Sequence, residues 1–531
     1  MRVLYQNGNI YTGKRFVNSF VVENGRFTDV GKKEAEYDLC VDLKGRFVSA
    51  GFNDSHMHLF SFGNALHMAQ LQDHTSSLEE LIRYGKVFLK QHPKKEGQWL
   101  LGRGFNQDYF SGEHVIPQKE DLDKISLDIP VLFTRSCGHC CVANSKALAL
   151  AKITKETEEV AGGKIGREEN GEPNGQFFDN AMDLIQSAVP LPNKEEIKER
   201  IVTACEALNS YGITSSQTDD YCVYRAIPYE VINEAYEELK EEGKLSVRVY
   251  EQCNFTEAEE FQRFLDNGNR TGKGNALFKI GPLKMLGDGS LGSRTACLSV
   301  PYADDPATKG FTLCSNEKMN TMVDLANKNN MQVAIHAIGD ACLDQVLNAI
   351  EKAQANNYRE DSRHGIVHCQ ISRYDQLDKI AEMNLHVYAQ SIFLDYDNHI
   401  VEQRVGKELA ESSYRWKTLM EKGVHVSNGS DAPVEMPDVL KGIQCAVTRC
   451  SLDGCGPYLK EEAFLVAEAL RSFTYEGAYA SFEEKEKGLI EEGYLADFVV
   501  LSEDPFTADP AKIHTIEVLK TYLGGREVYS K

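Results

Sequence analysis

"GFNDSHMHL", residues 51–59, places His56 and His58 one residue apart at the end of an apolar run. In a β-strand, residues i and i+2 point to the same face, so both imidazoles can coordinate one metal ion. The chain has 14 histidines in 531 residues, and roughly 0.3 such pairs are expected by chance, so the motif alone is weak. The other ligands of a metal site must come from the rest of the chain.

Working outward from this stretch, eight segments read as strands, and helical patterns such as residues 194–212 and 340–357 separate most of them. Alternating strands and helices predict a parallel α/β sheet, and eight such units predict a (β/α)8 TIM-like barrel. A doubly wound open sheet is the alternative, but no glycine-rich phosphate loop follows an early strand. The expected strands are residues 47–54, 212–219, 245–251, 278–286, 332–340, 365–370, 385–391 and 424–433.

Both ends of the chain differ from this pattern. Residues 2–13 and 15–31 look like short strands joined by Asn-Gly turns, and residues 493–506 and 516–530 match them in style. We therefore expect antiparallel β-structure at both ends and a composite β-sandwich domain built from the two termini. The expected boundaries are 1–48 and 487–531 for the sandwich and 49–486 for the barrel, with a large insertion after barrel strand one at about residues 70–190.

Composition narrows the class of protein. The net charge of −22 argues against a nucleic-acid partner, and 42% apolar with 26% charged residues is typical of a soluble globular protein. The chain has no run of 18 apolar residues and no secretory start, so we expect no membrane association and a cytoplasmic location. Its 14 cysteines form no CxxC pair, and the adjacent Cys140 and Cys141 are expected to fill a core.

Polar side chains lie at the ends of several expected strands, where barrel active sites are built. Singly, each has a structural explanation, since a histidine at a strand end is usually a hydrogen-bonded rim or core residue and an aspartate before Ala-Pro can cap a turn. Together they are the inward ligands that a divalent metal ion needs. They are His56 and His58 on strand one, Lys284 on strand four, His336 on strand five, His368 on strand six and Asp431 after strand eight.

Stretches spread over nearly the whole chain resemble the amidohydrolase superfamily, and within it the YtcJ-like group (amidohydrolase family 3). The stretches that carry the resemblance include "KMLGDGSLGSRTA" (284–296), "HAIGDACLDQVL" (336–347), "SNGSDAPV" (427–434) and "GLIEEGYLADFVVL" (488–501). The resemblance implies a metal-dependent hydrolase on a barrel with a terminal β-sandwich.

The resemblance also implies roles by position. His56 and His58 match ligands of a first metal, His336 and His368 match ligands of a second, and Asp431 matches the catalytic aspartate. Lys284 matches the lysine that bridges two metals once it is carbamylated, and burial near cations would supply the neutral amine that this reaction needs. The alternative for Lys284 is an ion pair at the strand end, in which case the site holds one metal.

Four further residues are expected to contact substrate: Asp288, Ser290 and Arg294 in the loop after strand four, and His139 in the insertion. For Asp288 and Ser290 a tight turn, and for His139 a surface role, are the alternatives. Asp219 and Asp220 at the end of strand two are expected to accept hydrogen bonds behind the ligands. Asn174 and Asp179 depart from the residues common in relatives, which leaves the substrate open.

The function expected from these features is hydrolysis of a C–N bond, other than a peptide bond, in a small amide, N-substituted formamide or cyclic amide. Metal-bound hydroxide would attack the carbonyl, and Asp431 would carry the proton. We expect one or two divalent ions per chain, with zinc favoured over iron or manganese. A deaminase or isomerase on the same site, and a non-catalytic binding or regulatory relative, are the alternatives. The expected partner is a small molecule, and a homodimer is left open.

Overall fold

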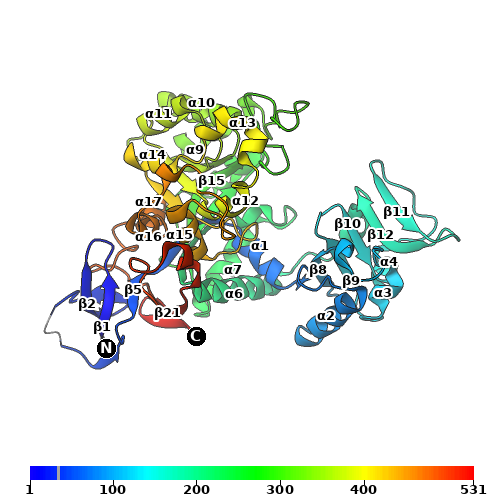
Figure 1. Ribbon diagram of the computed structural model, residues 1–531, viewed down its shortest axis with the longest axis horizontal. Helices are drawn as coiled ribbons and strands as arrows, with labels where there is room; N and C mark the ends of the chain where they lie inside the picture. The colour runs from blue at the N-terminus through cyan, green and yellow to red at the C-terminus, as the bar shows by residue number, and fades with distance from the viewer. Residues whose placement is uncertain (33–35) are drawn as a thin grey trace. The chain divides into compact units, whose positions relative to one another are not determined.

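The computed structural model describes residues 1–32 and 36–531 (Figure 1). The chain divides into two compact units. The first contains residues 1–61 and 201–531, and the second contains residues 62–200. The expected boundaries at 48, 70–190 and 487 stay predictions.

The first unit contains a parallel eight-stranded sheet whose strands pair in chain order, which confirms the α/β barrel expected from the sequence. Six of the strands fall within expected segments, and β6 and β14 overlap theirs but extend three residues beyond the expected ends, to Met57 and Asn254. The strands are β6 (Phe52–Met57), β13 (Ile213–Thr218), β14 (Arg248–Asn254), β15 (Phe278–Leu286), β16 (Val333–Ala337), β17 (Gly365–His368), β18 (His386–Ala389) and β19 (Val426–Asn428).

Helices alternate with the barrel strands, as a parallel sheet requires. The helices expected at residues 194–212 and 340–357 are α6 (Lys194–Ser210) and α10 (Asp340–Asn356). The others that follow barrel strands are α1 (Leu59–Leu66), α7 (Tyr229–Glu241), α8 (Ala258–Asp266), α9 (Asn316–Lys328), α11 (Tyr374–Glu382), α12 (Leu394–Asp397), α13 (Val401–Glu411), α14 (Trp416–Glu421), α15 (Val439–Thr448), α16 (Val466–Ser472) and α17 (Tyr475–Ala480).

The first and last strands of the barrel meet where the chain leaves them. The Asp431 backbone N–H donates to the His56 carbonyl at 2.8 Å, and the His58 N–H donates to the Ala432 carbonyl at 2.8 Å. Gly429 permits this approach, because a Cβ at that position would lie 2.6 Å from the backbone nitrogen of His56. The barrel is therefore nearly closed, and its closure brings Asp431 beside His56 in β6 and beside His58, which follows this strand.

Strands from the two termini form a second sheet, in which the blue β1, β2 and β5 lie near the red β21 in Figure 1. Its order is β22-β21-β20-β5-β1-β2-β3, with β4 also paired to β1. The strands are β1 (Arg2–Tyr11), β2 (Phe16–Glu23), β3 (Arg26–Thr28), β4 (Leu39–Asp42), β5 (Phe47–Ala50), β20 (Phe498–Leu501), β21 (Val518–Leu523) and β22 (Arg526–Ser530).

Two expectations about this sheet are wrong. The sheet is mixed and not purely antiparallel, since β1 pairs in parallel with both β4 and β5. Asn24 and Gly25 do form the turn between β2 and β3, but Asn7 and Gly8 lie inside β1. Asn7 adopts a φ of 56° there, and the pairing register with β2 shifts, so the Asn-Gly signal marks an irregularity within one strand.

Aromatic rings from both ends of the chain pack together in the core of the terminal sheet. Tyr5 and Phe498 lie edge to face at 5.1 Å between ring centroids, and Phe498 stacks on Tyr522 at 4.3 Å. Burying each ring contributes roughly 1.5–3 kcal/mol. A buried ion pair links this sheet to the barrel, because Arg248 of β14 donates from Nε to Asp497 Oδ2 at 2.7 Å and from Nη2 to Oδ1 at 2.9 Å.

The second unit has its own six-stranded sheet, in the order β11-β12-β10-β9-β8-β7. Cys140 and Cys141 are buried in it, as expected. Its strands are β7 (Ala69–Gln70), β8 (Leu100–Phe105), β9 (Val131–Arg135), β10 (Cys140–Ala143), β11 (Gly163–Arg167) and β12 (Pro173–Asp179), and its other helices are α2 (Leu78–Gln91), α3 (Lys119–Asp123), α4 (Ser145–Ala151) and α5 (Met182–Gln186). Among the described residues, no helix is long and apolar enough to cross a membrane.

Candidate metal centre

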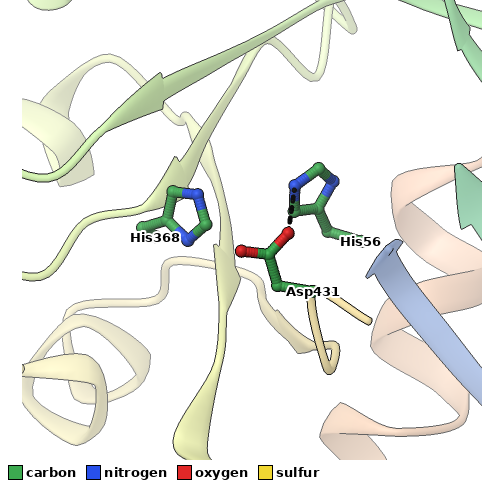
Figure 2. A group of neighbouring side chains, drawn as sticks. All are labelled: His56, His368 and Asp431. Atoms are coloured by element: carbon green, nitrogen blue, oxygen red, sulfur yellow. Dashed lines mark ion pairs between the residues drawn. The ribbon is translucent and has the colours of Figure 1, made fainter. Parts of the chain in front are cut away.

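Three of the expected ligands converge where β6, β17 and β19 end: His56, His368 and Asp431 (Figure 2). Each offers a ligand atom, and the three atoms lie within 4.8 Å of one another. The distance from His56 Nε2 to Asp431 Oδ1 is 3.4 Å, and both side chains are buried. We refer to these three residues as the first donor group.

Two glutamines orient the imidazoles of the first donor group. Gln252 Oε1 lies 2.9 Å from His56 Nδ1, and Gln390 Oε1 lies 2.7 Å from His368 Nδ1. Each glutamine amide nitrogen donates to a backbone carbonyl, which turns its oxygen toward the ring. The oxygen must accept a hydrogen bond, so each Nδ1 carries the proton and each Nε2 keeps a free lone pair. That is the tautomer in which Nε2 can bind a metal.

A second donor group lies beside the first and contains His58, Asp219 and Cys222. His58 Nδ1 contacts Asp219 Oδ1 directly. His58 Nε2 lies 2.9 Å from Asp431 Oδ1 and so joins the two groups. Asp219 follows β13, and Cys222 ends the short 3₁₀ helix η2 (Asp220–Cys222). His56 in β6 and His58 just after this strand therefore belong to different donor groups.

The Lys284 amine lies between the two groups. Its Nζ is 3.3 Å from His56 Nε2 in the first group and 3.3 Å from Asp219 Oδ2 in the second. The side chain is about 1% exposed. A lysine at this position reaches both groups, as a bridging carbamate requires. Its unmodified amine also forms an ion pair with Asp219, which is the alternative to carbamylation.

Electrostatics favour neutral imidazoles in the first donor group. Burial lowers the pKa of His56, and the charge of Lys284 lowers it further. Burial also lowers the pKa of His368 well below its ordinary value, with a further contribution from His336. A neutral imidazole is the form that binds metal.

The carboxylates are ionised. Burial raises the pKa of Asp431, but its contacts with His56 and His58 outweigh burial and hold the pKa well below the ordinary value. Burial likewise raises the pKa of Asp219, and the charges of His58 and Lys284 outweigh it and lower the pKa overall. The first donor group therefore presents an anionic oxygen next to neutral nitrogens, the combination that attracts a divalent cation.

The backbone is strained at two of the donor residues. His368 has a φ of 76° and Asp431 a φ of 60°. Residues other than glycine adopt this left-handed region rarely, and such outliers gather at functional sites. The strain occurs where the chain turns from strand to loop and aims each side chain into the centre.

His336, a further expected ligand, belongs to neither donor group. Its ring lies 4.5 Å from that of His368 between centroids, but its Nε2 is 3.1 Å from the Gly289 carbonyl and 3.2 Å from Asp288 Oδ1. The Asp288 carboxylate is buried and also accepts three backbone N–H groups, those of Cys297, Ile338 and Gly339. In this arrangement Asp288 holds the loop together and contacts His336.

The other expected substrate contacts have partners of their own. Ser290 Oγ lies 2.7 Å from the hydroxyl of Ser293. Arg294 forms a two-bond ion pair with Asp304, at 3.0 and 2.8 Å. His139 belongs to the second unit, where its Nδ1 lies 3.1 Å from Asp179 Oδ1. Their roles toward a substrate stay predictions.

Sequence reasoning missed part of the centre. Asp219 was expected behind the ligands, but it is itself a donor in contact with His58 and Lys284. Cys222 was not singled out, although "TDDYC" places a carboxylate and a thiol three residues apart after an expected strand. The orienting glutamines, Gln252 and Gln390, carry no sequence signal that separates them from other amides.

The residues present fit a divalent metal ion. The two groups supply imidazole, carboxylate and thiol donors, and Lys284 lies between them. Asp219 Oδ1 is a buried carboxylate oxygen whose partner is His58 Nδ1. Such an atom is costly to bury unless a cation satisfies it.

Comparisons with known proteins agree with this chemistry. The family model described as "Amidohydrolase family" matches residues 40–529. The Bacillus subtilis (strain 168) protein YtcJ, named as an amidohydrolase, is 35% identical over 100% of both chains. An N-substituted formamide deformylase of Arthrobacter pascens is 25% identical over 94% of this chain and 92% of its own length. A crystal structure of an uncharacterized metal-dependent hydrolase from Pyrococcus horikoshii OT3 has a TM-score of 0.78 at 28% identity, covering 96% of this chain and 99% of that one.

Proposed function

Because this chain belongs to the amidohydrolase family, we propose that it is a metal-dependent hydrolase that cleaves a C–N bond in a small amide, N-substituted formamide or cyclic amide. The observation that carries the proposal is the convergence of the two donor groups at the ends of β6, β13, β17 and β19. Barrel enzymes build their active sites at this end of the strands. The deformylase among the relatives favours an N-substituted formamide as substrate.

The first donor group and His58 would hold a divalent ion, with zinc favoured for a centre of this composition. Bound there, the ion would supply Lewis-acid chemistry and would make water more acidic. Lys284 would bridge to a second ion after carbamylation, since its Nζ lies 3.3 Å from a donor of each group.

Asp431 would move the proton. Its carboxylate is ionised, lies at the open end of the barrel strands and contacts both His56 and His58. An ionised carboxylate at this place can accept a proton from the attacking water and deliver it to the leaving nitrogen. The contacts from His56 and His58 both reach Oδ1 and fix the orientation of the carboxylate.

The test compares the parent protein with Asp431→Asn in a screen of small amides, N-substituted formamides and cyclic amides. Metal content is measured by elemental analysis before kinetics. The asparagine keeps the shape of the side chain and one oxygen but cannot take the proton. We expect most of the metal to remain and kcat to fall by on the order of 10²-fold or more.

The matched control is Asp397→Asn, which alters another buried carboxylate of the barrel. Asp397 accepts hydrogen bonds from Tyr414 and Gln370 and belongs to neither donor group. The Asp397→Asn protein should keep parental metal content and turnover. Parental turnover in a fully metallated Asp431→Asn protein would remove Asp431 from the mechanism. If the metallated parent binds a small ligand tightly but turns over nothing in the screen, the function is binding; ammonia release from an amine substrate would indicate a deaminase.

A further inference from the structure

The second donor group contains a sulfur atom that the proposed hydrolysis does not use. Cys222 Sγ lies within 4.8 Å of a ligand atom of His58 and of Asp219. Its thiol donates to the Asp219 backbone carbonyl at 3.1 Å, which holds the sulfur close to the end of β13. The chain has 14 cysteines, and within the described residues only Cys222 belongs to a donor group.

The neighbouring carboxylate gives an independent reason to place a cation here. Asp219 is about 1% exposed, and its two carboxylate oxygens contact His58 Nδ1 and Lys284 Nζ. The first contact places Oδ1 beside the imidazole of the group. A buried carboxylate beside an imidazole and a thiol is the donor arrangement of a mixed N, O and S metal site.

We propose that Cys222 is a sulfur ligand of the metal centre, acting with His58 and Asp219. This inference rests on the proposed metal-dependent function. The thiol loses its proton to solvent when the metal binds, and the sulfur then donates an electron pair to the ion.

A sulfur ligand changes which ions the centre prefers. Thiolates favour zinc over harder ions such as manganese, which prefer oxygen donors. The second donor group would therefore select zinc, or cobalt as its spectroscopic substitute. The alternative is that Cys222 only packs at the end of η2 and uses its thiol to cap the Asp219 carbonyl.

The experiment strips the full-length protein of metal with a chelator and reloads it with Co²⁺ or Zn²⁺. A Co²⁺–sulfur bond produces a charge-transfer absorption in the near ultraviolet, and X-ray absorption of the zinc form should show a sulfur neighbour at about 2.3 Å beside nitrogen and oxygen at about 2.0–2.1 Å. The expected result is both signals in the parent. Both should disappear in Cys222→Ser, and zinc affinity should fall by at least roughly tenfold.

Cys450→Ser is the matched control. Cys450 is also partly buried, and its thiol also donates to a backbone carbonyl, that of Thr448 at 3.5 Å, but it belongs to neither donor group. This variant should keep both sulfur signals. Circular dichroism checks that each variant folds. If Cys222→Ser does not fold, the sulfur signals of the parent protein still decide the question.

A parent protein that binds zinc or cobalt with nitrogen and oxygen neighbours alone overturns this inference and leaves the proposed hydrolase intact. Persistence of the sulfur signals in Cys222→Ser also overturns it. A parent that binds neither ion overturns the inference and the proposed function together.

Discussion

Replacing Gly429 with alanine tests whether the closure of the barrel positions the metal centre. The added Cβ would lie 2.6 Å from the backbone nitrogen of His56, 2.7 Å from its carbonyl oxygen and 2.7 Å from Asp54 Oδ1. Two of these three neighbours are backbone atoms and cannot rotate away. The loop after β19 must therefore move from β6 by about 0.8 Å before ordinary van der Waals contact is restored.

This movement has two consequences. Overpacking of this kind costs about 1–3 kcal/mol of folding free energy. It also shifts Asp431, two residues along, away from His56 and His58, and a displacement near 1 Å in a catalytic group can cost on the order of 10²-fold in rate. We expect Gly429→Ala to lower the unfolding temperature, the metal content and the turnover together.

The assays are thermal unfolding, elemental analysis and turnover of the best substrate from the screen. Gly112→Ala is the control, because a Cβ at position 112 meets nothing within 4 Å and the residue has no positive φ. The control should match the parent in all three measurements. A Gly429→Ala protein with parental unfolding temperature and metal content would refute the argument that close contact at this glycine sets the geometry of the centre.

Three other perturbations test separate parts of the structure. Lys284→Ala should abolish most turnover, and added short carboxylic acids should restore part of it if a carbamate bridges two ions; kinetics with and without acetate, and the metal count, decide this. Asp497→Ala should lose about 3–5 kcal/mol of stability in denaturant unfolding, because it leaves the buried Arg248 without its partner; a loss below 1 kcal/mol would contradict that. Burial lowers the pKa of His364 to about 3, so the folded protein does not take up the proton that an unfolded histidine binds below pH 6.5. Stability should fall as the pH drops below 6.5, by about 2 kcal/mol at pH 5 from this residue, and His364→Gln should flatten the pH profile of the unfolding free energy.

The sequence by itself determined the barrel and the family. Most of the expected barrel strands contain an apolar run, and helical patterns separate most of them, so the signal is largely local. The relationship to the amidohydrolase superfamily, read from motifs such as residues 284–296 and 336–347, is confirmed by the matches over the chain. The local signal was misleading at Asn7 and Gly8, where the same dipeptide that forms a turn at Asn24 and Gly25 lies within a strand.

The tertiary structure alone decided how the candidate residues are grouped. His56 lies in β6 and His58 directly after it, yet the first lies with His368 and Asp431 and the second with Asp219 and Cys222. Such groups bring together the ends of strands that lie far apart in the chain, and their membership depends on the stagger and closure of the barrel. A spacing in the sequence can indicate that a residue lies at a strand end, but the direction in which its side chain points there follows from contacts such as that of Gly429 with His56, which exist only in the folded chain.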